Sequence, residues 1–192
     1  MGLSSCEDKD ENNLYNGHEY VDLGLSVKWA TCNLGASKPE EYGNYYAWGE
    51  TSPKNSYTES NYTYSNNPST LPLNKDAASV NMGGKWRMPT KEECQELIEK
   101  CYFMECYQNY VFGYKVIGPN NNFIFLPATG YYDNDSRKRE KRFVCWSSSL
   151  YETVPSLAYG MNIFLKDFYG RLVAEGENDV FCREQGLPIR GV

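Results

Sequence analysis

The stretch Gly83–Cys101 reads GGKWRMPTKEECQELIEKC, and it predicts the one long helix of the chain. Thr90 suits the N-cap, Glu93 three residues later completes a capping box, and Pro89 disfavours helix before them. Behind this start, apolar side chains recur at helical spacing at Cys94, Leu97, Ile98 and Cys101. The remaining positions, Glu96 among them, are polar. We therefore expect an amphipathic helix over about residues 90–102 whose narrow apolar stripe packs against something flat.

Nearly every other segment has the pattern of a strand or a loop, which indicates an α+β fold made mostly of antiparallel β structure with long loops. Apolar and polar residues alternate over residues 21–29, which form one strand or two short strands around a turn at Gly24. Further strands are predicted over residues 110–117, 123–126, 143–149, 157–165 and 186–190. Segments 110–117 and 123–126 are predicted to form a hairpin.

Residues 51–79 contain hardly an aliphatic side chain before Leu71, so this segment cannot build a core of its own. It is predicted to be a long surface excursion. Tyr57, Tyr62 and Tyr64 within it either pack onto the domain or contact a ligand, and packing is the expected role.

Composition restricts the class of function. The chain has 192 residues, a formal net charge of −6, 17 Tyr and 4 Trp. This length suits a single domain, which we assign to residues 18–192. The negative charge disfavours nucleic acid as a partner, and no apolar run approaches a membrane span. Tyr and Trp offer a large contact area with a hydrogen-bonding end, which suits a recognition surface, although most should pack between sheet and loops.

The first residues suggest a lipid anchor. Leu3–Cys6 (LSSC) resembles a bacterial lipobox, and the acidic run Glu7–Glu11 follows directly. On this interpretation Cys6 is lipidated, and residues 1–17 contain a flexible tether that holds the domain at an outer membrane. The lipid on Cys6 would be the only contact with the membrane. The alternative is a disordered acidic N-terminus with a chance cysteine.

Catalytic and metal-binding patterns are scarce. The one histidine, His18, cannot by itself specify a catalytic triad, so a structural role is expected. No phosphate-binding loop, zinc spacing or calcium loop is recognisable, and we expect no cofactor or metal. Six cysteines besides Cys6 invite disulfide pairing. Cys94 and Cys101, however, lie about 10 Å apart along one helix, beyond the roughly 7 Å that a disulfide spans between Cα atoms.

Several longer blocks resemble the Fibrobacter succinogenes major paralogous domain family of secreted and surface proteins, common in Bacteroidetes. They are HEYVDLGLSVKWATCN at 18–33, YYAWGE at 45–50, GGKWRMPT at 83–90, FLPATG at 125–130 and WSSS at 146–149. The resemblance covers roughly residues 18–190. The family usually ends in a Val-Arg-Pro-Val type strand, whereas this chain ends in Ile189-Arg190-Gly191-Val192. The glycine is expected to loosen the last turn and leave the strand intact.

The resemblance implies a C-type-lectin-like fold in which the two ends of the domain pair, so residues 27–31 should lie beside residues 187–190. It also implies a non-catalytic, adhesin-like lipoprotein at the cell surface, or facing the periplasm, whose ligand is an extracellular glycan or protein. In similar proteins the ligand meets the surface after the Trp-Ser-Ser block. The binding residues implied here are Tyr151, Glu152, Tyr159, Asn162, Tyr169 and Arg171, with Tyr131, Tyr132 and Asn134 as an extension.

Two other functions remain open. The helix start at residues 87–90 also looks like a block of the formylglycine-generating enzymes, which implies a cysteine-dependent oxidase as the alternative. The calcium-binding motifs of sugar-binding C-type lectins are not found in the chain. A purely structural role, as a subunit of a surface assembly, is the third possibility.

Overall fold

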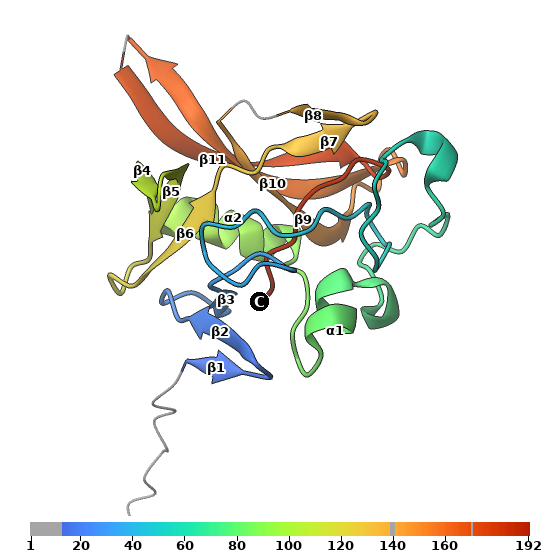
Figure 1. Ribbon diagram of the computed structural model, residues 1–192, viewed down its shortest axis with the longest axis horizontal. Coiled ribbons are helices and arrows are strands. Elements are labelled where there is room, and N and C mark those ends of the chain that lie inside the picture. Colours follow the sequence, from blue (N-terminus) through green and yellow to red (C-terminus); the bar gives the residue numbers. More distant parts are fainter. Residues whose placement is uncertain (1–12, 139–140, 170) are drawn as a thin grey trace, which may run out of the picture.

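The computed structural model describes residues 13–138, 141–169 and 171–192, except for the side chains of Arg171 and Leu172. These residues have an α+β architecture of mostly antiparallel strands with two α-helices (Figure 1). The helical elements are η1 (Glu59–Asn61), η2 (Leu73–Lys75), α1 (Ala77–Met82) and α2 (Lys91–Lys100). The strands are β1 (Leu14–Tyr15), β2 (His18–Val21), β3 (Trp29–Ala30), β4 (Tyr102–Gln108), β5 (Val111–Ile117), β6 (Phe123–Pro127), β7 (Tyr131–Asp133), β8 (Ser136–Lys138), β9 (Phe143–Leu150), β10 (Leu157–Phe168) and β11 (Arg171–Cys182).

These strands pair in four groups. Three-stranded sheets have the orders β1-β2-β3, β4-β5-β6 and β11-β10-β9, and β7 pairs with β8. The predicted hairpin is confirmed as β5 and β6, and residues 21–29 resolve into the ends of two short strands, β2 and β3. Strand β4 was not predicted, because its exposed Tyr102, Met104 and Tyr107 hide the alternation that marks a half-buried strand.

Helix α2 begins at the predicted cap. The Thr90 side chain accepts a hydrogen bond from the Glu93 N–H (3.3 Å), and the Glu93 carboxylate accepts one from the Thr90 N–H (2.8 Å). The Arg87 guanidinium donates two hydrogen bonds to the same carboxylate, at 2.5 and 2.7 Å. Burial raises the pKa of Glu93, but the hydrogen bonds from Arg87 and Thr90 outweigh it and lower the pKa overall. The carboxylate therefore stays charged and fixes the helix start to the segment before it.

The apolar stripe of α2 is confirmed as core. Cys94 and Leu97 are fully buried, whereas Ile98 and Cys101 are half-buried at the edge of the contact. The helix ends at Lys100, two residues before the expected limit. It packs against β9, β10 and β11, which is the flat surface that the narrow stripe requires.

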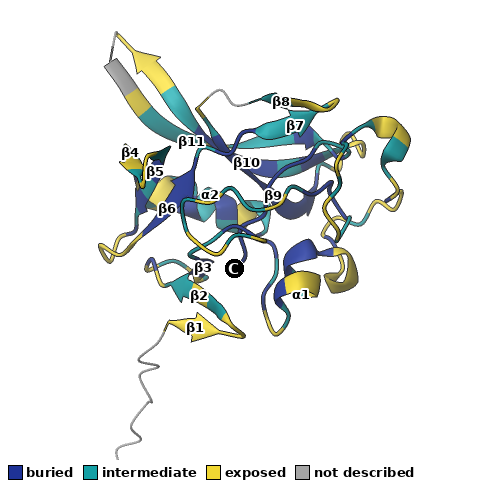
Figure 2. Cartoon of the chain, viewed as in Figure 1, coloured by how far each residue is buried: buried dark blue, intermediate teal, exposed yellow. Residues whose placement is uncertain are grey.

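Strand β9 is buried along its whole length, because both faces of its sheet are covered (Figure 2). Val144 and Trp146 point into a cluster that contains α1, Trp48 and the C-terminal segment. Phe143 and Cys145 point into a second cluster with α2 and the β4-β5-β6 sheet. The outer edge of β9 is also closed, since its amides donate to the carbonyls of Pro188 (3.1 Å), Pro89 (2.7 Å) and Ser69 (2.9 Å). The strand predicted over residues 143–149 is thus enclosed on both faces and along its outer edge.

The two ends of the domain lie side by side, as predicted. The Ala30 N–H donates to the Gly191 carbonyl, and the Leu34 N–H donates to the Ile189 carbonyl, both at 2.9 Å. The predicted last strand is not continuous, however. Residues 186–190 form only isolated bridges, because three different segments each pair with one or two of these residues.

A buried arginine joins these ends. The Arg190 guanidinium is fully buried and donates to the Ala30 carbonyl (2.9 Å), the Asn33 side chain (2.9 Å) and the Phe125 carbonyl (3.2 Å). Burial lowers its pKa to about 10, so it remains charged at neutral pH. Three neutral oxygens therefore stabilise the buried cation. Through them, Arg190 connects the C-terminal segment to residues 30–33 and to β6.

A second arginine holds the excursion. Arg183 is buried and donates to Tyr62 Oη (2.8 Å), Asn67 Oδ1 (2.7 Å) and the main-chain carbonyls of Tyr64 (2.7 Å), Asn66 (2.8 Å) and Pro155 (2.9 Å). Its guanidinium also lies 4.8 Å from the Trp48 ring centroid. Tyr57 and Tyr64 are buried and Tyr62 is half-buried, which confirms that these tyrosines pack onto the domain. The excursion is not structureless, since its end forms η2 and α1 with Asp76 as N-cap.

The six cysteines from Cys32 onward are all free thiols, so the expected possibility of disulfides among them is not realised. Neither α-helix in the described part of the chain is long and apolar enough to cross a membrane.

Candidate functional site

A cavity of about 340 Å³ opens between residues 43–57 and strand β7. It is lined by Gly43, Asn44, Tyr45, Pro53, Lys54, Asn55, Tyr57 and Tyr132, and we call it the tyrosine pocket. Its volume lies at the small end of the range typical of ligand-binding sites. Three aromatic rings and two amide side chains line it, so it offers both flat apolar faces and directed hydrogen bonds.

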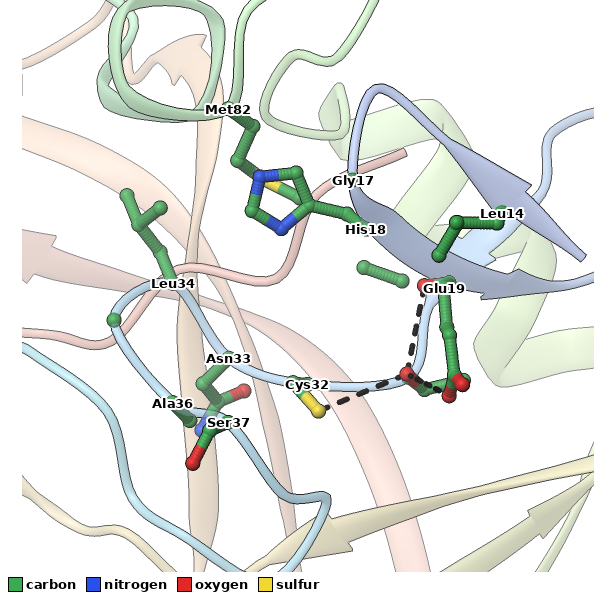
Figure 3. Close-up of a pocket in the computed structure, with 13 residues that line it drawn as sticks. Leu14, Gly17, His18, Glu19, Cys32, Asn33, Leu34, Ala36, Ser37 and Met82 are labelled. Atoms are coloured by element: carbon green, nitrogen blue, oxygen red, sulfur yellow. Dashed lines mark hydrogen bonds between the residues drawn. The ribbon is translucent and has the colours of Figure 1, made fainter.

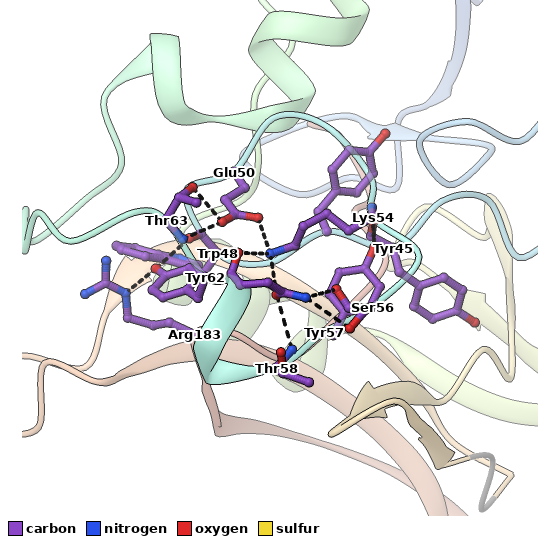
Figure 4. Close-up of polar contacts among 12 residues, drawn as sticks. Tyr45, Trp48, Glu50, Lys54, Ser56, Tyr57, Thr58, Tyr62, Thr63 and Arg183 are labelled. Atoms are coloured by element: carbon purple, nitrogen blue, oxygen red, sulfur yellow. Dashed lines mark hydrogen bonds and ion pairs between the residues drawn. The ribbon is translucent and has the colours of Figure 1, made fainter.

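The three rings support one another. Tyr132 stacks on Tyr57 with ring centroids 5.7 Å apart, and it meets Tyr45 edge-to-face at 4.9 Å. The Tyr57 hydroxyl donates to the Tyr45 carbonyl and accepts from the Lys54 N–H (3.1 Å). Figure 4 shows Tyr45, Tyr57 and Lys54 together with the polar contacts that surround them. The aromatic wall is therefore formed before any ligand arrives.

Gly186 and Asp135, which both contact the segment around Tyr57, make this arrangement possible. A Cβ on Gly186 would lie 2.7 Å from the Tyr57 ring, so only glycine leaves room for that ring. The Gly186 main chain pairs with Tyr132 in both directions, at 2.8 and 3.0 Å. Asp135, in the turn between β7 and β8, accepts from the Tyr57 N–H (2.7 Å) and from the Ser56 hydroxyl (3.0 Å). The β7–β8 hairpin thus holds the excursion against the domain on one side of the pocket.

Tyr45 is held from the opposite side. Its hydroxyl donates to the Thr129 carbonyl (2.8 Å) and accepts from Arg137 (2.8 Å). The Arg137 guanidinium also covers the ring of Tyr42, 4.7 Å from the centroid. Burial raises the pKa of Tyr45 to about 12, and burial likewise raises the pKa of Tyr57 to about 12. Both phenols are therefore neutral at physiological pH.

The charge of the pocket is balanced. Lys54, its one charged lining residue, forms an ion pair with Glu50 at 2.7 Å and donates to Asn61 Oδ1 and the Asn61 carbonyl, each at 3.1 Å. Asn44 and Asn55 are exposed at the rim. The Asn44 side chain is hydrogen-bonded to Tyr46, so Asn55 is the amide available to a ligand. The lining contains no carboxylate, thiol or imidazole. The arrangement is suited to hold an uncharged polar molecule with flat faces.

A second cavity, of about 440 Å³, contains the residues that a nucleophilic mechanism would need. His18, Glu19 and Cys32 all line it (Figure 3). The Cys32 sulfur faces the Thr31 hydroxyl at 3.7 Å, and this hydroxyl lies 3.5 Å from the Glu19 carboxylate. His18 is instead on the side of Met82, with its ring edge-to-face on Trp86 at 6.1 Å. Within the described residues no hydrogen bond joins His18 to Cys32, so the thiol and its only possible imidazole partner are not paired.

Of the predicted extension of the binding surface, the structure brings one residue of three, Tyr132, to the tyrosine pocket. Tyr132 lines it directly. Tyr131, its neighbour in β7, packs edge-to-face on Phe181 at 5.4 Å. Asn134 is exposed in the β7–β8 turn, and its amide contacts Asp133 at 3.4 Å.

The main predicted set runs from the loop between β9 and β10 to the tip of the β10–β11 hairpin. Tyr151 and Tyr159 form an edge-to-face pair at 5.4 Å, with Glu152 exposed beside them. The Lys91 ammonium lies 4.9 Å over the Tyr159 ring, which places this pair near the start of α2. Asn162 is only 2% exposed, and its amide reaches Glu177 and Asp179 at 3.3 and 3.4 Å.

Tyr169 lies at the other end of this hairpin and is fully exposed. Ten residues of strand separate it from Tyr159, a distance of about 30 Å. Tyr151 and Tyr169 are therefore not parts of one pocket. The Arg171 side chain and the predicted lipidation site, Cys6, lie outside the described residues.

Four lining residues of the tyrosine pocket were not predicted from the sequence as site residues: Asn44, Tyr45, Lys54 and Asn55. The available signal was the density of tyrosines between residues 42 and 64, where six occur. That density does not show which rings pack inward, because the answer depends on contacts with β7 and Gly186, more than 70 residues away in the chain.

Comparison of the chain with protein-family models, with curated proteins and with solved structures finds no match in any of the three.

Proposed function

We propose that the chain is a non-catalytic binding module whose tyrosine pocket holds a neutral saccharide. The observation that carries this proposal is the pocket itself, with three preformed phenol rings, two exposed amides and a lysine already neutralised by Glu50. Sugar rings present C–H faces that pack on aromatic rings, and their hydroxyls exchange hydrogen bonds with amides and phenols. A charged ligand would gain no unpaired opposite charge there.

We further propose that the fold is C-type-lectin-like and that the domain is displayed at the cell surface on a lipid attached to Cys6. The first part is supported by the family-like sequence blocks, by the pairing of the two ends of the domain through Ala30 and Gly191, and by the long excursion held by Arg183. The second part rests on the sequence LSSC alone.

A glycan array tests the proposal, with the parent protein applied in calcium and again in a chelator. We expect binding to neutral oligosaccharides that is equal in both buffers, because no carboxylate lines the pocket. Asn55→Ala should weaken the signal without changing the melting temperature, because Asn55 is exposed at the rim. Tyr132→Ala should abolish it, and a thermal melt of that variant checks that the domain remains folded.

Matched controls separate this site from the alternatives. Tyr151→Ala and Tyr169→Ala alter the surface predicted from the sequence, in the β9–β10 loop and at the β10–β11 turn, and should leave glycan binding unchanged. Loss of binding in these variants, with binding intact in Tyr132→Ala, would move the site to the hairpin. If the parent protein binds on a protein array and not on the glycan array, the ligand is a protein and not a saccharide. Copper-dependent thiol oxidation by the purified protein would instead support the oxidase.

A further inference from the structure

A separate cavity of about 420 Å³ lies between the β1-β2-β3 sheet and residues 85–87. Its lining residues are Tyr15, Tyr20, Val27, Lys28, Lys85, Trp86, Arg87 and Val192. We call it the lysine pocket. It shares no residue with the tyrosine pocket, and its chemistry is different, because three cationic side chains surround three aromatic rings.

Hydrogen bonds hold the aromatic side chains of the lysine pocket in place. The Trp86 indole N–H donates to the Tyr15 carbonyl (2.9 Å), and the Tyr15 hydroxyl accepts from the Lys85 N–H (3.1 Å). The Tyr15 and Trp86 ring centroids are 6.2 Å apart. Gly84 has a φ of +61°, and a Cβ there would lie 2.8 Å from the Tyr15 ring, so glycine is needed for this ring to occupy its place.

Two of the three cations have no carboxylate partner among the described residues, although the Lys28 ammonium donates to the Tyr20 hydroxyl at 3.5 Å. The Arg87 guanidinium is occupied by Glu93, through both of its terminal nitrogens. Lys28 and Lys85 are exposed and form no ion pair with any residue that the structure describes. The Lys28 ammonium lies 4.5 Å over the Tyr20 ring. A protein of net charge −6 thus has two unneutralised lysines at the mouth of one aromatic cavity.

We propose that the lysine pocket binds a carboxylate-bearing sugar, such as a hexuronic acid. The sugar ring would pack on Tyr15 and Tyr20, which are exposed and half-exposed, while its carboxylate lies between Lys28 and Lys85. A single negative charge between two ammonium groups fits better than a phosphate. Phosphate is best held by a free guanidinium fork or a set of main-chain amides, and Arg87 is already engaged.

The test is isothermal titration of the full chain with digalacturonic acid, with its dimethyl ester as a neutral probe of nearly the same shape. The parent protein should bind the acid, and binding should weaken as salt increases. The ester should bind at least about tenfold more weakly, because it lacks the charge that the lysines recognise. Equal affinity for acid and ester would overturn the proposal.

Variants locate the site. Lys28→Gln with Lys85→Gln should reduce affinity for the acid by about tenfold or more, whereas the corresponding pair of Lys→Arg changes should retain it. Lys166→Gln removes an exposed lysine from the distant β10–β11 hairpin and should have no effect. Tyr132→Ala should also leave this binding unchanged, which separates it from the tyrosine pocket. Undiminished binding of digalacturonic acid in the double glutamine variant would contradict the assignment. Tighter binding of inorganic phosphate than of digalacturonic acid would also contradict it.

Discussion

Glu96 shows how one contact changes the role of a residue that a helix pattern assigns to solvent. Its carboxylate accepts hydrogen bonds from the Ser26 N–H (3.0 Å) and the Ser26 hydroxyl, and it forms an ion pair with Lys100 at 2.8 Å. These contacts tie the middle of α2 to the loop between β2 and β3. Helical spacing alone could not indicate this, because Ser26 lies 70 residues away in the chain.

The same contacts predict a pH dependence. Hydrogen bonds from Lys100 and Ser26 lower the pKa of Glu96 from 4.5 to about 2. Because the pKa is lower in the folded state, the stabilisation is complete above about pH 5 and is lost as the pH falls toward 2. Urea melts of the parent and of Glu96→Gln should therefore differ at pH 6 and converge near pH 2.5. A difference between the two proteins that is the same at both pH values would show that the charge of Glu96 contributes nothing.

At the scale of single elements, the sequence was most informative where the determinants are local. The capping box at Thr90, the spacing of Cys94 and Leu97, and the turn between β5 and β6 all lie within a few residues of the elements they specify. Strand β4 was missed because its exposed side chains break the alternation, and helix α1 was missed because its determinants are not local. Asp76 caps α1, and its carboxylate also accepts a hydrogen bond from the Met88 N–H at 2.8 Å. The start of this short helix therefore depends on a residue that comes after the helix in the sequence.

The core role of α2 can be measured. Leu97 is fully buried between the helix and the β9–β10 sheet, so Leu97→Ala should lower the free energy of unfolding by about 2–5 kcal/mol. Glu92→Ala, on the exposed face of the same helix, should change it by less than about 0.5 kcal/mol. Urea melts at pH 7 give both values. Equal midpoints for the two variants would mean that the buried face of α2 is assigned wrongly.

The excursion is expected to depend on Arg183. Arg183→Lys keeps the charge but cannot make five hydrogen bonds, so the acceptors near residues 62–67 would lose their donor. We expect faster amide hydrogen exchange at Tyr57 and Thr63, whose amides are bonded to Asp135 and Glu50, while α2 stays protected. Arg87→Lys, at the start of α2, should leave the exchange of the excursion unchanged. Unaltered exchange in Arg183→Lys would show that the tyrosines alone hold the segment.

At the scale of the whole molecule, two cores enclose the β9-β10-β11 sheet, and irregular segments rather than a strand close its β9 edge. The α+β class and the meeting of the two ends of the domain were predictable, from strand patterns and from family-like blocks. The tyrosine pocket was not, because it forms where the excursion, the β7–β8 hairpin and Gly186 meet. Of the residues implied by the sequence, Tyr132 lines this pocket, while Tyr151 lies in the β9–β10 loop and Tyr169 at the far end of β10.

The most direct measurement is an NMR titration of the isotope-labelled protein with the neutral oligosaccharide that gives the strongest array signal. We expect amide resonances to shift at residues 43–45, 54–57 and 132, and those of Tyr151, Tyr159 and Tyr169 to stay in place. The same titration of Tyr132→Ala should show no shifts. Shifts confined to the β10–β11 hairpin, or none around the pocket at saturating ligand, would contradict the proposal that the tyrosine pocket is the binding site.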